Sequence, residues 1–303
     1  MDTLRRFLRK KLLWPALCSL VLAGAGARAE EPASACAASA RGIPARAERA
    51  PGASEFIASV AGLGDHARDE AIRDELLAGN LPQFLRRVRP AILNARLRDG
   101  RSVQLTLCVL SDYLGLGADN DFLLVPMGLD SALAVATKFG FTLPTRRIVD
   151  LIYRAADVHL LPQPLPANDR MRSTAYLQQH GALVARQRAA LGAPPGALTA
   201  GHKKDLVLSE RLWRQPGRVA IYGWQRADGT PIQPLSTVHG ERYADYSHGV
   251  RLVSQTMFVD GRPARLLDVL ADDTLGPLLS DEGPLAPAAG WLAARAGRDG
   301  RGH

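Results

Sequence analysis

The sequence predicts one compact α+β domain, in which a helical N-terminal half packs on a mostly antiparallel C-terminal sheet. Before about residue 198, several segments carry apolar residues at helical spacing. From about residue 199, short apolar runs alternate with turn sequences, and no regular strand–helix–strand alternation appears. The chain has 303 residues, of which 47% are hydrophobic, so it is long enough to bury a substantial core.

The first 29 residues have the pattern of a secretory signal peptide. A basic stretch, "MDTLRRFLRKK", precedes the apolar run "LLWPALCSLVLAGAG", and Ala27-Arg28-Ala29 has the form of a cleavage site. The apolar run is shorter than the roughly 20 residues that a membrane-spanning helix needs. We therefore expect a secreted or periplasmic protein with no stable membrane anchor after the signal is cleaved.

Cleavage also changes the charge of the chain. Residues 1–29 hold six of the 38 basic residues and one of the 30 acidic residues, so the net charge falls from +8 to +3. The high proportion of basic residues thus belongs largely to the export signal. We expect no nucleic-acid partner.

The segments after the signal differ in composition. Residues 30–53 are rich in Ala, Pro, Ser, Arg and Gly without a hydrophobic period, so we expect a flexible arm. The α+β domain is expected over residues 54–284, helix-rich to about 198 and β-rich from about 199. Residues 285–303, rich in Ala, Gly and Arg, are expected to form a flexible tail.

Strands and helices alternate irregularly through the first half of that domain. The stretch 54–88 is expected to be helical, and "RSVQLTLCVL" alternates like a strand. Residues 111–127 predict a hairpin that turns at residues 118–121. Helices are expected in residues 128–140, 142–160 and 173–192, the first of them ending at Gly140.

The second half reads mainly as strands. Apolar runs at residues 204–210, 218–224, 231–237 and 249–261 each predict one strand. Asp228-Gly229-Thr230 and Asp260-Gly261-Arg262 have the composition of hairpin turns.

Cys36 and Cys108 are the two cysteines that remain after cleavage. In an oxidising compartment they are able to form a disulfide that ties the arm to the domain. Cys108 lies within an apolar strand, where a buried free thiol is an equally good interpretation. The sequence leaves both open.

The candidate site consists of two polar segments on either side of the apolar strand "RVAIYGW". "GHKKD" contributes His202, Lys204 and Asp205, and "HGERYADYSHG" contributes His239, Asp245, Tyr246, Ser247 and His248. If the strands that follow these segments are close in one antiparallel sheet, all eight side chains converge on one cleft. Taken singly, each of these residues is more often an ordinary polar side chain on a solvated rim.

Each member of the site has an expected role. His248 is expected to be the general base or acid, because Gly249 beside it allows close approach of a substrate. Asp245 or Asp205 would orient it, and Lys204 or the Tyr246 hydroxyl would stabilise developing negative charge. Ser247 is a candidate nucleophile.

A minor alternative is a zinc ion bound by His239, Asp245 and His248. Otherwise no cofactor is expected, because the chain has neither the glycine pattern of a dinucleotide site nor that of a phosphate-binding loop.

"SHGVRL" resembles the "SHGC" box of the L,D-transpeptidases, enzymes that cross-link peptidoglycan through a cysteine nucleophile. The resemblance covers Ser247, His248, Gly249 and Arg251. Val250 stands where those enzymes have the cysteine, so the resemblance implies no cysteine chemistry here.

These observations favour a secreted or periplasmic hydrolase or transferase with His-centred acid/base chemistry. Its expected substrate is a cell-envelope or extracellular polymer, such as a peptidoglycan peptide, amide or glycan. The alternative is a non-catalytic protein of the same compartment that binds a ligand or serves a structural role.

Overall fold

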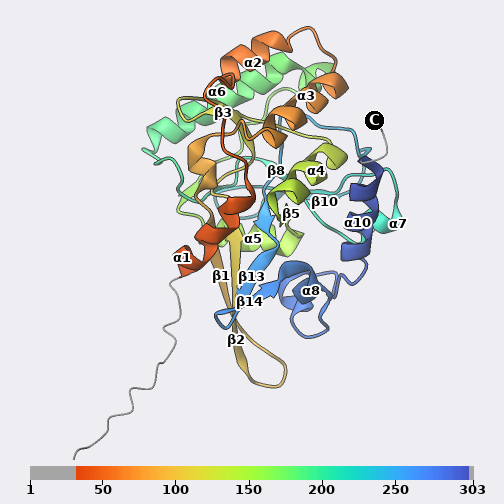
Figure 1. The fold of residues 1–303 in the computed structure, drawn as a ribbon. Helices are drawn as coiled ribbons and strands as arrows, with labels where there is room; N and C mark the ends of the chain where they lie inside the picture. Colours follow the sequence, from red (N-terminus) through yellow and green to blue (C-terminus); the bar gives the residue numbers. More distant parts are fainter. Residues whose placement is uncertain (1–31, 300–303) are drawn as a thin grey trace, which may run out of the picture.

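The larger of the two main sheets is centred on β2 (Ser102–Val109) in the computed structural model, which describes residues 32–299. Every strand pair in this six-stranded sheet is antiparallel. Figure 1 shows the β1–β2 hairpin extending away from the body of the protein. The strand order is β14 (Arg262–Arg265), β13 (Thr256–Val259), β2, β12 (Val253–Ser254) and β5 (Phe141–Thr142), with β1 (Arg89–Arg96) also paired to β2.

The smaller main sheet carries the segments of interest. Its order is β10 (Pro231–Ser236), β9 (Ile221–Gln225), β8 (Lys204–Leu206) and β11 (His248–Gly249). Two-stranded sheets join β3 (Gly115–Ala118) to β4 (Asp121–Leu124) and β6 (Val158–His159) to β7 (Thr199–Ala200). The sheets are mostly antiparallel, with parallel pairing only at β8–β11 and β6–β7 among the described strands.

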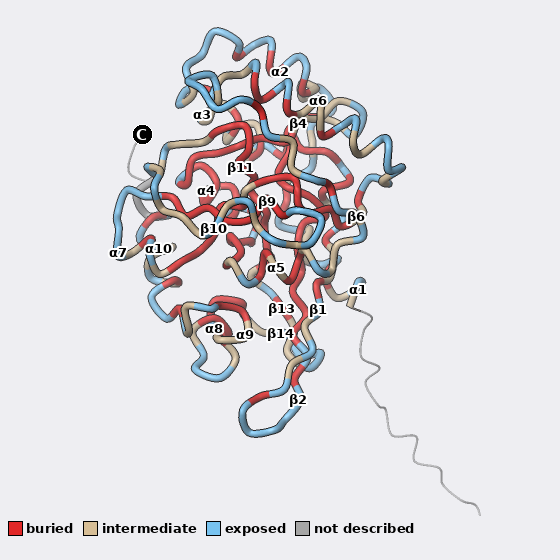
Figure 2. Tube along the Cα trace, turned by 180° about the vertical axis from the view of Figure 1, so that it is seen from behind, coloured by how far each residue is buried: buried red, intermediate tan, exposed pale blue. Residues whose placement is uncertain are grey.

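Helices surround these sheets. In Figure 1, α2, α3 and α6 lie together at one end, and α8 and α10 lie toward the other side. Figure 2 shows the buried chain concentrated in the middle of the protein. The helices are α1 (Pro32–Ala37), α2 (Ala53–Ser59), α3 (Asp65–Leu77), α4 (Leu129–Phe139), α5 (Arg146–Ala155), α6 (Thr174–Ala190), α7 (Arg211–Arg214), α8 (Leu266–Ala271), α9 (Gly276–Leu279) and α10 (Ala288–Asp299).

Local signals explain several of these boundaries. Gly140 ends α4 with φ of 80°, a left-handed conformation that costs glycine little. The Thr145 hydroxyl accepts a hydrogen bond from the amide of Ile148 and so caps α5, and Ser173 caps α6 in the same way. The predicted hairpins at β3–β4, β9–β10 and β13–β14 are confirmed.

The α+β class is confirmed, but helices and strands are not divided between the two halves as expected. β1 and β2 lie in the N-terminal half, although they form the centre of the larger sheet. Helices α8 to α10 lie at the C-terminal end. The expected strand over residues 249–261 is also divided, because β11 joins the smaller sheet while β12 and β13 join the larger one.

Both expected flexible segments are folded where the structure describes them. The predicted signal peptide, residues 1–29, lies outside the described residues. In the expected arm, α1 packs against the larger sheet, and Cys36 forms a disulfide with Cys108 on β2. In the expected tail, Leu285 and Ala288 are buried, and Arg295 of α10 pairs with Asp130 and Glu241. These long-range contacts have no local sequence pattern.

Candidate functional site

The two polar segments meet because β8 and β11 are adjacent and parallel. His248 pairs with Lys204 and Gly249 with Asp205, and the Lys204 amide donates to the Ser247 carbonyl at 2.8 Å. The two segments are thus neighbours in one sheet, but their pairing is parallel and not antiparallel as expected, and "RVAIYGW" contributes β9 on the other side of β8. Paired residues share a face of a sheet, so Lys204 and His248 lie on one face and Asp205 on the other.

Five residues form what we call the histidine cluster on the first face: Lys204, His239, Tyr243, Asp245 and His248. The His239 ring stacks on Tyr243, with centroids 4.0 Å apart and planes within 5° of parallel. The His248 ring lies 6.0 Å from that of His239 and 5.7 Å from that of Tyr243. Asp245 Oδ2 is 3.9 Å from His248 Nε2. The cluster thus holds two imidazoles, a carboxylate, a phenol and an ammonium.

The histidine cluster is buried at His248 and Asp245 and partly open at a rim formed by His239, Tyr243 and Lys204. His248 is fully buried and Asp245 nearly so, whereas His239, Tyr243 and Lys204 are only half-buried. Neither ring nitrogen of His248 has a hydrogen-bond partner within the described chain. A buried polar atom without a protein partner is rare and costly, which makes His248 a candidate for a functional role.

Trp224 adds a strained neighbour to the cluster. Its φ is 60°, which is rare for a side chain of this size, and Lys204 Nζ lies 5.1 Å from the centre of its ring. The indole Nε1 is buried and lacks a hydrogen-bond acceptor among residues 32–299. Backbone strain of this kind costs on the order of 1–3 kcal/mol and is concentrated at functional sites.

Burial sets the protonation of the cluster. Desolvation lowers the pKa of His248 to about 4, although the Asp245 charge opposes the shift. Desolvation also lowers the pKa of His239. For Asp245, burial raises the pKa, but the His248 charge and the hydrogen bonds from Ser247 outweigh it and leave the pKa below its usual value. At neutral pH the site therefore contains neutral imidazoles beside a carboxylate, which suits a histidine to act as a base.

Ser247 and Tyr246 have other contacts than those expected. The Ser247 hydroxyl and amide both donate to Asp245 Oδ1, at 2.5 and 2.8 Å, so this buried serine orients the carboxylate. The Tyr246 hydroxyl accepts from the Leu165 amide at 2.7 Å and its ring packs on Tyr176. The Tyr246 side chain is thus directed away from the position that would stabilise negative charge at the cluster.

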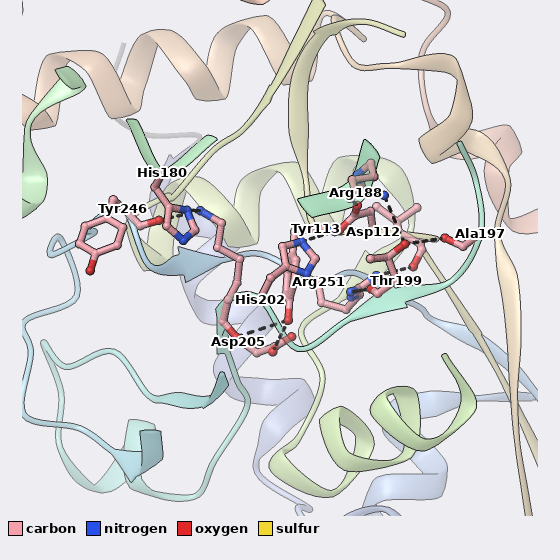
Figure 3. A network of polar contacts seen from close by, with 12 residues as sticks. Asp112, Tyr113, His180, Arg188, Ala197, Thr199, His202, Asp205, Tyr246 and Arg251 are labelled. Carbon is pink, nitrogen blue, oxygen red and sulfur yellow. Dashed lines mark hydrogen bonds and ion pairs between the residues drawn. The ribbon is translucent and has the colours of Figure 1, made fainter. Parts of the chain in front are cut away.

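His202 and Asp205 belong to a separate buried network, shown in Figure 3. His202 Nε2 lies 3.3 Å from Asp112 Oδ1 without the alignment of a hydrogen bond, and burial lowers the pKa of His202. Asp205 accepts a hydrogen bond from the Tyr113 hydroxyl at 2.8 Å. Burial raises the pKa of Asp205 to about 7, against the influence of Arg251 and Tyr113. His202 and Asp205 therefore contact Asp112 and Tyr113 and do not join the histidine cluster as expected.

The buried network depends on charged residues that sequence reasoning did not select. Asp112 pairs with Arg188 of α6. The charge of this arginine helps to hold the pKa of Asp112 well below its usual range despite burial. Arg251 is fully buried, donates to the carbonyls of Leu110 and Thr199, and lies over the Tyr113 ring. The position of Asp112 just after the predicted strand "RSVQLTLCVL" is the sequence feature that could have identified it as a site residue.

Gly249 is required for packing rather than for the approach of a substrate. A Cβ atom added there would lie 2.6 Å from Tyr113 Cδ1 and 2.8 Å from Lys203 Cβ. We expect Gly249→Ala to lower the free energy of unfolding by about 1–3 kcal/mol through overpacking. The control is Gly290→Ala, where nothing lies within 4 Å. Equal urea midpoints for the two variants would contradict this role.

The buried histidines also predict acid lability. Desolvation lowers the pKa of His248 to about 4 and of His180 to about 2, so the folded protein resists protons that the unfolded chain takes up near pH 6.5. Their contribution to stability is complete above pH 6.5 and is lost as the pH falls. Asp205 has its pKa raised to about 7, so it contributes the opposite change: its share of the free energy of unfolding rises as the pH falls from 7 toward the pKa of an unfolded aspartate.

We expect the free energy of unfolding to fall by about 2 kcal/mol or more between pH 7 and pH 4.5, since the two histidines together outweigh Asp205. Urea unfolding at a series of pH values measures this. Asp205→Asn removes the opposing contribution and should steepen the loss. A free energy that stays constant or rises toward pH 4.5 would show that these histidines are solvated.

Within residues 32–299, no group of three His, Cys, Asp or Glu side chains is arranged to hold a metal ion. His239, Asp245 and His248, the residues of the alternative zinc site, therefore do not form such a group. In the same range, no helix combines the length and apolar character needed to cross a membrane.

A scan against models of protein families finds no match, and searches of the curated proteins and of the solved structures find no significant similarity.

Proposed function

We propose that the protein is an extracytoplasmic hydrolase or transferase that acts on a cell-envelope or extracellular polymer, with His239 as its general acid or base. The observation that supports this most is that the half-buried His239 ring lies 6.0 Å from the ring of the fully buried His248, which in turn lies beside the Asp245 carboxylate. Because His248 is fully buried and His239 is only half-buried, His239 is the histidine that would contact the substrate.

The other members of the histidine cluster have matching roles in this proposal. Neutral His239 would take a proton from water or from a substrate hydroxyl and later return it to the leaving group. The Lys204 ammonium, half-buried beside Trp224, would stabilise the negative charge that develops on the attacked group. His248 and Asp245 would position the rim and set its electrostatic potential. The substrate class rests on the signal-peptide pattern of residues 1–29.

The test is incubation of the mature protein with purified peptidoglycan and with extracellular polysaccharides, with released fragments measured by mass spectrometry. His239→Ala should reduce the rate by about 10²- to 10⁴-fold, the usual contribution of a general acid or base. His66→Ala alters an exposed histidine of α3 and should leave the rate unchanged. Fragment release that His239→Ala does not slow would refute the proposed role.

A non-catalytic binding function is the second candidate, and one observation favours it. A cavity of about 850 Å³ lies between α5, the end of α6 and the β9–β10 turn, and none of the eight predicted site residues lines it. Its walls include Tyr153, Tyr222, Asp150 and Arg154. Stable binding of a polymer without any released fragment, weakened by Tyr153→Ala but not by His239→Ala, would support this function instead.

A further inference from the structure

A smaller cavity, of about 210 Å³, lies between α6 and the β3–β4 hairpin. Most of its wall is apolar: Phe122, Leu123, Leu124, Gly181, Val184 and Ala185. An apolar cavity of about 150 Å³ in another protein holds benzene, so this one has room for a single ring or a short alkyl chain with a small polar group.

A buried lysine lies at the wall of this cavity without a counter-charge. Lys203 is 1% exposed, and its Nζ donates to the Tyr246 carbonyl at 2.6 Å and lies 3.3 Å from His180 Nδ1. Within the described residues, no carboxylate is within ion-pair distance of this ammonium. An ammonium has three donors, and a buried charge that is unpaired is costly. Burial lowers the pKa of Lys203 to about 7, although the charges of Asp245 and Asp112 oppose the shift. Below that pH, Lys203 is a buried ammonium with an unused donor and without an ion-paired carboxylate.

His180 supplies a second unused donor to the same cavity. Because an ammonium only donates, His180 Nδ1 must accept from Lys203, and the neutral ring then carries its hydrogen on Nε2. His180 is fully buried, and its Nε2 has no hydrogen-bond partner within residues 32–299. Figure 3 shows His180 and Tyr246 together at one end of the buried network.

The other cation at the cavity is already engaged. Arg188 ion-pairs with Asp112 and donates to the Thr199 hydroxyl at 3.3 Å. Asn120 and Asp121 also line the cavity, and the Asp121 carboxylate accepts from the amide and the hydroxyl of Ser54. The donors of Lys203 and His180 are therefore free, and the rest of the wall is mostly apolar. A carboxylate is the anion that would accept from both and supply the missing charge.

We propose that this cavity binds a small monocarboxylic acid with an apolar body, its carboxylate held by Lys203 and His180 and its ring or short chain enclosed by α6 and β4. This proposal is independent of the hydrolase function, because it concerns a different face and needs no catalysis.

The test is isothermal titration of the mature protein at pH 6 with benzoate, and with benzamide as a neutral ligand of the same shape. We expect benzoate to bind with a Kd below about 10 mM and benzamide to bind at least about tenfold more weakly. Lys203→Met should weaken benzoate by at least about tenfold, whereas Lys138→Met, which alters an exposed lysine of α4, should leave the affinity within about twofold.

Absence of benzoate binding at about 10 mM would overturn the proposal, as would equal binding of benzoate and benzamide. Unchanged binding by a folded Lys203→Met variant would overturn it too. If Lys203→Met does not fold, the comparison of acid with amide on the unaltered protein still decides, because the two ligands differ only in the charge and acceptors that Lys203 and His180 recognise.

Discussion

Asp112→Ala should lower the free energy of unfolding by about 3–5 kcal/mol, because it leaves a largely buried cation without its counter-charge. Asp112 is 1% exposed and pairs with Arg188, while His202 lies 3.3 Å away. Removing the carboxylate leaves the Arg188 guanidinium unpaired in a mostly buried position. Equilibrium urea unfolding measures the loss.

Asp273→Ala is the matched control for this prediction. Asp273 is exposed, so its loss should change the free energy of unfolding by no more than about 0.5 kcal/mol. If Asp112→Ala proved as mild as Asp273→Ala, the buried network would not hold α6 against the sheets.

Replacing both Cys36 and Cys108 by Ala should lower the free energy of unfolding by about 4 kcal/mol. The two cysteines are separated by 72 residues, and a cross-link over a loop of this length removes much of the conformational entropy of the unfolded chain. The bond also fixes α1 to β2. Urea unfolding of the variant measures the loss, and a thiol assay of the unaltered mature protein under denaturing conditions should find no free thiol.

Treatment with a reductant provides the control for the substitutions. It should destabilise the unaltered protein by a similar amount and leave the double variant unaffected. A reductant that changes neither protein, together with two titratable thiols, would show that Cys36 and Cys108 are not joined in solution.

The elements that were predicted correctly are those with local causes. The turn composition around Asp228 and Asp260 specifies hairpins whose strands are neighbours in the chain, and Gly140 ends α4 by its own conformational freedom. These signals act over a few residues, so one sequence is sufficient to detect them.

The features that were missed depend on contacts between distant residues. β11 is a two-residue strand whose parallel partner, β8, lies more than forty residues earlier, and so short a strand has no hydrophobic period of its own. The same holds for Arg251, which is fully buried because Leu110 and Thr199 supply acceptors from elsewhere in the chain. Composition alone predicts a long charged side chain to be exposed.

The candidate site shows both cases. The sequence predicted that His239, Asp245 and His248 would lie together, because they belong to one segment whose turn brings their side chains close. It did not show that Lys204 would join them while Asp205, the next residue, would face the buried network. That separation follows from the alternation of side chains along β8, once its pairing with β11 is known.

NMR titration of His239 and His248 tests most directly whether these two histidines, Asp245 and Lys204 form one electrostatic unit. The Asp245 charge raises the pKa of both histidines and the Lys204 charge lowers it. Asp245→Asn should therefore lower both pKa values, Lys204→Met should raise both, and Lys138→Met should change neither. If either His239 or His248 keeps the same pKa in both Asp245→Asn and Lys204→Met, the four residues do not act together and the account of the site is wrong.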